Sequence, residues 1–142
     1  MQTVLADTGF WLALLNARDQ HHALARTLHQ VKTWRYITTW PVLTETCHLL
    51  SARMSPDVAP SFLESGLRGA FEIAELPDDT HTRAIELMRR YVKLPMDLAD
   101  ASLIILAEEL GHGRILSTDR RDFKSYRWKN RKPFSNLMFP ND

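Results

Sequence analysis

The sequence predicts an α/β fold in which a mainly parallel sheet is covered by helices. Two observations support this prediction. Short apolar or β-branched runs alternate with longer segments whose apolar residues recur at helical spacing, and turn or capping residues separate the two kinds of segment. The chain contains no internal repeat, low-complexity tract or Gly/Ser linker. Such alternation is typical of parallel sheets, because each crossover between parallel strands carries a helix.

The alternation continues through most of the chain. In chain order we expect a strand at 3–6, helices at 10–16 and 20–31, a strand at 36–39, a helix at 41–54, a helix from 57 to about 66 or 69, a strand at 71–76, helices at 80–92 and 97–110, and a strand at 115–118.

Capping and helix-breaking residues set these bounds. Pro41 suits the first turn of the helix that runs to about Met54. Pro95 interrupts the pattern after the helix at 80–92, and Asp97 then opens the most apolar helix of the chain. Gly111 is expected to end that helix.

The composition favours one soluble domain over residues 1–142. With 44% hydrophobic residues, a chain of this length can build a single core. The single cysteine, Cys47, excludes an internal disulfide and a multi-cysteine zinc site, and it favours the cytoplasm. Asp7 interrupts the first apolar run, so no signal peptide is expected, and no apolar run approaches the roughly 18 residues of a membrane span.

Four acidic residues lie where predicted strands meet helix starts. Asp7 follows the first strand and Asp119 the last, whereas Glu45 and Asp100 fall near the starts of two helices. Ligands of open α/β sheets bind outside the carboxyl ends of the strands, and helix N-termini favour negative charge. We therefore expect the four carboxylates to converge. Clustered oxygen donors suit Mg²⁺ or Mn²⁺, which also offsets their mutual repulsion.

Each acid also has a purely structural interpretation. Asp7 would cap the helix that follows it, and Asp97 and Asp100 have the spacing of an N-cap and N3 pair. We therefore take Asp97 as a cap or a neighbour of the ligands, and Asp100 as a ligand. Glu45 alone would be an ordinary exposed glutamate, and Asp122 lies among arginines that would pair with it.

Positive charge is concentrated late in the chain. Seven basic residues between Arg120 and Lys132 stand against the single acid Asp122, and Phe123, Tyr126 and Trp128 are interleaved with them. This composition is typical of a surface that contacts phosphates and stacks bases. A solvated terminal loop would have the same charge pattern, so both interpretations stay open.

Taken together, these segments resemble PIN-domain ribonucleases, especially the VapC-type toxins of bacterial toxin–antitoxin pairs. The resemblance extends over nearly the whole chain and rests on four short motifs in order: Asp7-Thr8-Gly9-Phe10-Trp11, Thr44-Glu45, residues 97–104 and residues 117–123. It implies a three-layer α/β/α fold with a mainly parallel central sheet, and metal-dependent endonucleolytic cleavage of RNA.

The resemblance also implies roles for particular residues. The acidic quartet of the family maps onto Asp7, Glu45, Asp100 and Asp119. Asp7, Asp100 and Asp119 would bind one or two Mg²⁺ or Mn²⁺ ions, and Glu45 would bind metal or orient the attacking water. The supporting positions would be Thr8, Asp97, Thr118 and Asp122. The basic residues expected to attract the RNA backbone are Arg120, Arg121 and Lys124.

One position departs from the pattern, and two partners are implied. The usual Asp-Thr-Ser opening of the family is Asp-Thr-Gly here, which removes a hydroxyl at Gly9 but no carboxylate. A homodimer and a small cognate antitoxin are implied as partners. The segment 61–71 or the helix beginning at Phe10 would supply an apolar surface for the antitoxin, although the helix is expected to be mostly core.

Other functions fit the sequence less well. An aspartate phosphotransferase needs an acid at position 9, where this chain has Gly9, and a phospho-acceptor receiver needs a lysine where it has Ser117-Thr118-Asp119. The alternatives that stay open are a non-catalytic PIN-like module that binds RNA or protein, and a solitary RNA-processing nuclease.

Overall fold

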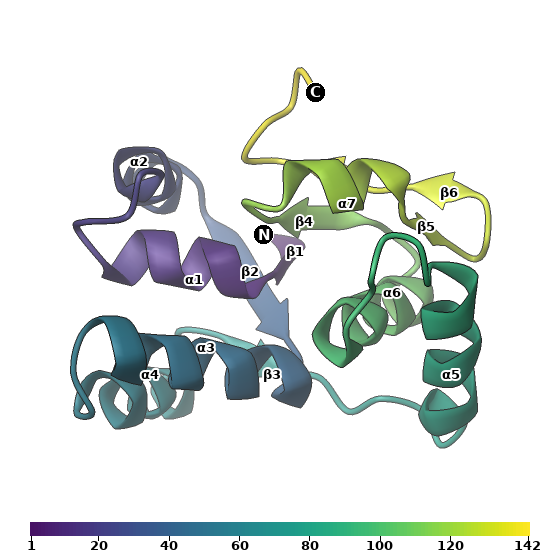
Figure 1. Ribbon diagram of the computed structural model, residues 1–142. Coiled ribbons are helices and arrows are strands. Elements are labelled where there is room, and N and C mark those ends of the chain that lie inside the picture. The colour runs from purple at the N-terminus through teal and green to yellow at the C-terminus, as the bar shows by residue number, and fades with distance from the viewer.

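A five-stranded sheet forms the centre of the computed structural model, which describes all 142 residues (Figure 1). The strands lie in the order β3-β2-β1-β4-β7, and every neighbouring pair is parallel. The predicted α/β fold with a mainly parallel sheet is confirmed. The bounds of the strands are β1 (Gln2–Ala6), β2 (Trp34–Thr38), β3 (Glu72–Ile73), β4 (Arg114–Leu116) and β7 (Ser135–Asn136).

Helices cover both faces of this sheet, and a short antiparallel hairpin of β5 and β6 lies beside it. The bounds are α1 (Thr8–Leu15), α2 (His22–Val31), α3 (Trp40–Arg53), α4 (Val58–Leu67), α5 (Thr80–Arg90), α6 (Leu98–Leu110), α7 (Arg120–Ser125), β5 (Arg127–Trp128) and β6 (Lys132–Pro133). None of the helices has the length and apolar character needed to cross a bilayer.

The order of the strands determines which helices share a face. From β1 the chain steps outward to β2 and β3, then returns past β1 to β4 and β7. Because parallel crossovers are right-handed, α1 to α4 cover one face and the helices after β3 cover the other. Figure 1 shows α1 to α4 together on one side of the sheet and α5 and α6 on the opposite side.

The core lies on both sides of the central strand β1, whose residues Val4, Leu5 and Ala6 are fully buried. α6 is apolar on almost every side because it is enclosed between the sheet and α5, and Gly111 ends it in the left-handed conformation at φ 76°. An aromatic cluster with ring centroids 5.0 to 5.5 Å apart joins α1, α4 and β2: Phe10, Trp11, Tyr36, Phe62 and Phe71.

The structure differs from the predicted segments mainly at edges and after β4. The strand expected at 71–76 is confined to Glu72–Ile73, because only these residues pair with β2. α1 begins at Thr8, two residues earlier than expected, since Asp7 is its N-cap. The part of the chain after Asp119, for which no element was predicted, forms α7, the hairpin and the edge strand β7.

Candidate active site

An acid-lined cavity of about 340 Å³ opens where β1 and β4 end and where α1, α3, α6 and α7 contribute side chains. All four acids predicted as catalytic line it, and so do all four predicted supporting residues. The polar residues around the cavity are Asp7, Thr8, Glu45, Arg53, Asp97, Asp100, Thr118, Asp119 and Asp122, and its remaining lining is Gly9, Leu12, Leu49 and Pro95.

Asp7 is the most buried of these carboxylates, with 7% of its surface exposed. One carboxylate oxygen accepts a 2.8 Å hydrogen bond from the backbone N–H of Thr8, as an N-cap does, and the other accepts a 2.8 Å bond from the Ser117 hydroxyl. Burial raises the pKa of Asp7 to about 6, and the negative charges of Glu45 and Asp119 act in the same direction. Asp7 therefore caps α1 and also faces the cavity.

Asp100 lies on the first turn of α6, three residues after the N-cap Asp97. The Asp97 carboxylate accepts a 2.8 Å hydrogen bond from the backbone N–H of Asp100, and the Tyr126 hydroxyl donates a 3.1 Å bond to the Asp100 carboxylate. Burial, followed by the negative charges of Asp7 and Asp97, raises the pKa of Asp100 to about 8. Without a cation, burial and these neighbouring charges favour the protonated form of the carboxyl.

Glu45 is the sixth residue of α3, one residue further from the helix start than the expected start at Pro41 implied. The helix begins at Trp40, with Thr39 as its N-cap, so its first turn contains no acid. Glu45 nevertheless lines the cavity, and burial together with the neighbouring Asp97 carboxyl raises its pKa. Glu45 therefore lies just beyond the first turn of α3, and its side chain lines the cavity with the other acids.

Asp119 and Asp122 enter the cavity from α7. Asp119 is the N-cap of this helix, and its carboxylate accepts a 3.2 Å hydrogen bond from the backbone N–H of Asp122. Burial and contact with the Asp122 carboxyl raise the pKa of Asp119. Asp122 forms a 3.2 Å ion pair with Arg121, as its position among arginines predicted.

Ser117 supports two of the acids, a role that the sequence did not reveal. Its buried hydroxyl donates to Asp7 and accepts a 3.0 Å hydrogen bond from the backbone N–H of Asp119. Asn136 of β7 bonds both backbone groups of Ser117, accepting at 3.3 Å and donating at 2.8 Å. The only signal in the sequence was that Ser117 adds a second hydroxyl beside Thr118, at the end of a strand that leads to the cavity.

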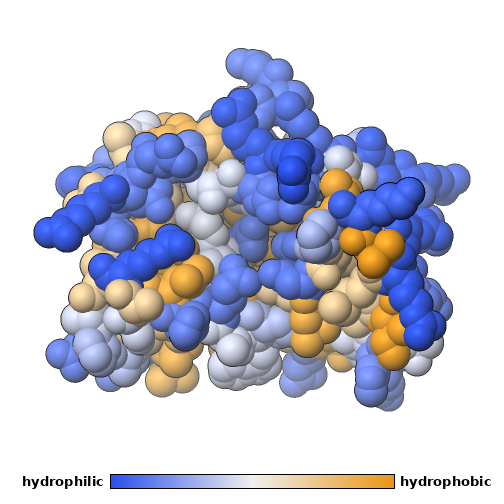
Figure 2. Space-filling model, in the orientation of Figure 1, coloured by the Kyte–Doolittle hydropathy of each residue, from blue (hydrophilic) through white to orange (hydrophobic).

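The basic residues predicted to attract RNA lie outside the acid-lined cavity. Arg120 pairs with Asp142 and stacks 4.3 Å from the centre of the Phe139 ring, and Arg121 pairs with Asp122. Arg120 and Lys124 line a separate, smaller cavity of about 190 Å³. The surface over α7 and the hairpin is mainly hydrophilic in Figure 2, so the charge is exposed there.

The expectation that the late aromatic residues stack bases was wrong. Phe123, Tyr126 and Trp128 have 2%, 0% and 7% of their surface exposed. They are buried because the hairpin packs against α6 and because Tyr126 packs edge-on against Phe123 and Tyr91, which turns the aromatic rings inward and leaves the basic residues outside. The alternative of a solvated loop was also wrong, since this segment has regular structure.

The donors around the cavity fit a hard divalent cation. Carboxylate and hydroxyl oxygens predominate, no ion pair neutralises Asp7 or Asp100, and burial raises the pKa of both. No group of three or more His, Cys, Asp or Glu side chains is already arranged to hold a metal ion. Binding would therefore have to draw the carboxylates closer together.

The fold and the cavity agree with what known proteins show. A family model of the PIN domain matches residues 4–129, and the chain belongs to this family. Two curated relatives come from Mycobacterium tuberculosis. Ribonuclease VapC26 is 25% identical over 124 residues, covering 87% of this chain and 92% of that protein. The 23S rRNA-specific endonuclease VapC20 is 28% identical over 108 residues, covering 76% and 82%.

Solved structures give the same result. The crystal structure of M. tuberculosis VapC20, described as a sarcin-ricin loop cleaving toxin, superposes with a TM-score of 0.74 at 26% identity and covers 82% of this chain and 89% of that one. A toxin–antitoxin complex from Klebsiella pneumoniae, at a TM-score of 0.57 and 20% identity over 84% and 89% of the chains, shows likeness of fold alone. The resemblance to VapC-type PIN-domain proteins is confirmed.

Proposed function

We propose that this chain is a divalent-metal-dependent endoribonuclease of the VapC type. The observation that carries the proposal is the acid-lined cavity itself, where carboxylates from four separate elements gather at the carboxyl ends of two parallel strands. The stability of the fold does not require so many buried or partly buried acids in one place, because uncompensated charge removed from water is destabilising. A role in binding a cation and a phosphodiester accounts for them.

The side chains divide into two roles. In this proposal Asp7, Asp100 and Asp119 would hold the cation. Glu45, which lies on α3 and lines the same cavity, would orient the attacking water and accept its proton. A bound Mg²⁺ or Mn²⁺ supplies an acidified water and positive charge beside the scissile phosphate. Ser117 and Tyr126 fix the carboxylates of Asp7 and Asp100 through hydrogen bonds.

The partners implied by the family have a surface available to them. An apolar groove of about 590 Å³ lies between α3, α4 and β3, with Leu67 91% exposed and Trp40 60% exposed. Much of it comes from the segment 61–71, whereas Phe10 to Ala13 of α1 are buried. We propose that an antitoxin binds this side of the molecule through the apolar groove.

The relatives indicate which RNA to test first. VapC20 acts on 23S rRNA and cleaves the sarcin-ricin loop. Structured ribosomal RNA is therefore our proposed substrate class. Contacts with phosphates carry no base preference, so other side chains would read the base sequence.

One assay tests the proposal. Purified protein is incubated with a ribosomal RNA fragment and Mn²⁺, with and without EDTA, beside Asp7→Asn and Asp100→Asn. We expect cutting that the chelator stops and that either substitution lowers by about 100-fold or more, the order seen when charge stabilisation is removed from an active site. Asp57→Asn is the matched control, because Asp57 also precedes a helix but is exposed and makes no side-chain cap bond.

Two outcomes would contradict the proposal. RNA that stays intact under every condition would favour the non-catalytic PIN-like module. Cleavage that persists in EDTA and in both Asn variants would show that the cavity is not the active site.

The neighbouring reading frame separates a toxin from a solitary RNA-processing nuclease. If the protein cleaves RNA but no antitoxin-like protein is encoded there, the solitary nuclease is favoured.

A further inference from the structure

Arg53 is the only basic side chain that lines the acid-lined cavity. It lies in the last turn of α3, is exposed to solvent, and forms no ion pair with any of the carboxylates around the cavity. An arginine that faces several acids and pairs with none of them is unusual, because the guanidinium fork matches carboxylates well.

The spacing along α3 explains why Arg53 stays unpaired. Glu45, Leu49 and Arg53 are four residues apart, so they share one face of the helix, and all three line the cavity. At 1.5 Å per residue, the backbone of Arg53 lies about 12 Å beyond that of Glu45 along the helix axis. The cavity therefore extends along α3 from an acidic end to a basic end.

The middle of the cavity is apolar. Leu49 lies between Glu45 and Arg53 on α3, and Leu12 of α1, which packs against α3, also lines the cavity. A polynucleotide with one phosphate at the acids would thus pass over an apolar stretch and bring a second phosphate toward Arg53. The carboxylates alone would repel such a strand. The positively charged guanidinium of Arg53 would attract its second phosphate.

We propose that Arg53 binds a backbone phosphate of the RNA other than the one that is cleaved, and thereby sets the path of the strand along α3. This inference rests on the proposed function, since it assigns a substrate contact to the same cavity. It differs from the expectation that the late basic segment attracts the RNA, because Arg120 and Arg121 are engaged with acids and Arg53 is not.

Kinetics of Arg53 variants test the assignment. For Arg53→Ala we expect the KM for an RNA oligonucleotide to rise about tenfold, the loss typical of one charged hydrogen-bonded contact, with kcat within about twofold. The plot of log kcat/KM against log salt should become shallower by about 0.7, as when one phosphate contact is lost from a single strand. Arg53→Lys should keep the salt slope and part of the affinity.

Two controls separate this role from a structural one. Arg26→Ala removes an exposed arginine of α2 that does not line the cavity, and it should change neither KM nor the salt slope. Arg53 lies in the last turn of α3, where a positive charge interacts favourably with the helix dipole. Losing that interaction would lower the stability of the protein but would leave the salt dependence of catalysis unchanged. Thermal melting of each variant, including Arg53→Gln, monitors that contribution.

A direct measurement of RNA binding tests the role of Arg53 even if no cleavage is detected. Fluorescence anisotropy with the labelled oligonucleotide is measured in the Asp100→Asn background, where cutting is expected to be slow. Adding Arg53→Ala should weaken binding about tenfold. Equal affinity with and without Arg53, or a kcat loss at constant KM, would overturn the inference while leaving the proposed function intact. Absence of cleavage by the unchanged protein would instead contradict the proposed function.

Discussion

Gly9 and Thr118 share a small space at the rim of the acid-lined cavity. A Cβ added at Gly9 would lie 1.9 Å from the Thr118 hydroxyl oxygen, closer than packed atoms allow, and 3.0 Å from the Thr118 Cβ, tighter than most packed contacts. Gly9 has no positive φ, so its backbone does not require glycine. The neighbouring threonine therefore accounts for glycine at this position, because Thr118 of the opposite loop occupies the space that a side chain at residue 9 would need.

Substitutions at this pair should be strongly coupled. Gly9→Ala should lower the free energy of unfolding by about 1–3 kcal/mol, because overpacking forces the loops apart. Thr118→Ala should cost less than about 1 kcal/mol and should recover most of the loss when combined with Gly9→Ala. Urea unfolding of the two single variants and the double variant measures the coupling, and strictly additive effects would contradict the shared space.

At the residue scale, the sequence predicted the acids better than the groups around them. Asp7 and Asp119 were identifiable because a charged residue directly after a buried strand has few structural explanations. Ser117 was missed because a hydroxyl at a strand end is common, and only the fold shows that it contacts two acids. Arg53 was missed because it looks like any solvated helix arginine until α3 is placed along the cavity.

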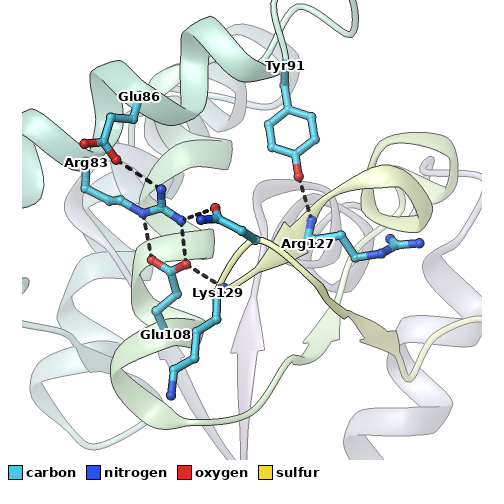
Figure 3. Close-up of polar contacts among 7 residues, drawn as sticks. Arg83, Glu86, Tyr91, Glu108, Arg127 and Lys129 are labelled. Atoms are coloured by element: carbon cyan, nitrogen blue, oxygen red, sulfur yellow. Dashed lines mark hydrogen bonds and ion pairs between the residues drawn. The ribbon is translucent and has the colours of Figure 1, made fainter.

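Among the elements, α5, α6 and the β5–β6 hairpin are held together by one polar network (Figure 3). Arg83 of α5 donates two hydrogen bonds to Glu108 of α6, at 3.0 and 2.7 Å, and a third to Asn130 in the hairpin turn. Glu108 also accepts a 2.6 Å bond from the backbone N–H of Lys129. Lys129 and Asn130 have φ of 50° and 62°, so the network stabilises a turn that side-chain-bearing residues seldom adopt.

Removing Glu108 from this network should loosen the hairpin. Both side chains of the Arg83–Glu108 pair are mostly buried, so Glu108→Gln should cost about 2 kcal/mol of stability and increase hydrogen exchange in residues 127–133. Arg68→Ala breaks the exposed pair with Glu64 and should cost at most about 0.5 kcal/mol. Equal effects of the two variants would show that the buried network has no special role.

Long elements were predictable and short ones were not. The most apolar helix was expected at 97–110 and is observed as Leu98–Leu110, because its cap, its apolar run and its final glycine all agree. The hairpin strands and β7 have two residues each, which is too short for any periodic pattern. Their positions depend on contacts with α6 and β4, which a single segment of sequence does not express.

For the whole molecule, the buried acids make the stability of the metal-free protein depend on pH. Asp7 and Asp100 have pKa values of about 6 and about 8 in the folded protein, above the value of 3.8 expected when unfolded. The folded state therefore binds these protons more tightly. The resulting stability is fully present below the unfolded pKa and is lost as pH rises through the folded values.

We expect the free energy of unfolding in EDTA to fall by about 2–4 kcal/mol between pH 4.5 and 8.5, after allowing for water in the cavity. Asp7→Asn should flatten this decline and stabilise the metal-free protein at the upper end. The lowered pKa of His112 makes stability rise with pH, opposite to the acids. Its contribution is the same in the variant and the parent protein, so it cancels when the two are compared. Mn²⁺ should raise the melting temperature more at pH 8 than at pH 5, and a metal-free stability that rises with pH would contradict this account.

The hydrogen bonds at Ser117 join segments made at very different times. Asp7 is synthesised first, Ser117 follows 110 residues later, and Asn136, which holds Ser117 in place, comes later still. Because the ribosomal exit tunnel shields the newest residues, a nascent chain has its first carboxylate outside long before the cavity can close. Under the proposed function, the growing polypeptide is inert toward RNA until the segments with Ser117 and Asn136 have emerged and packed against Asp7.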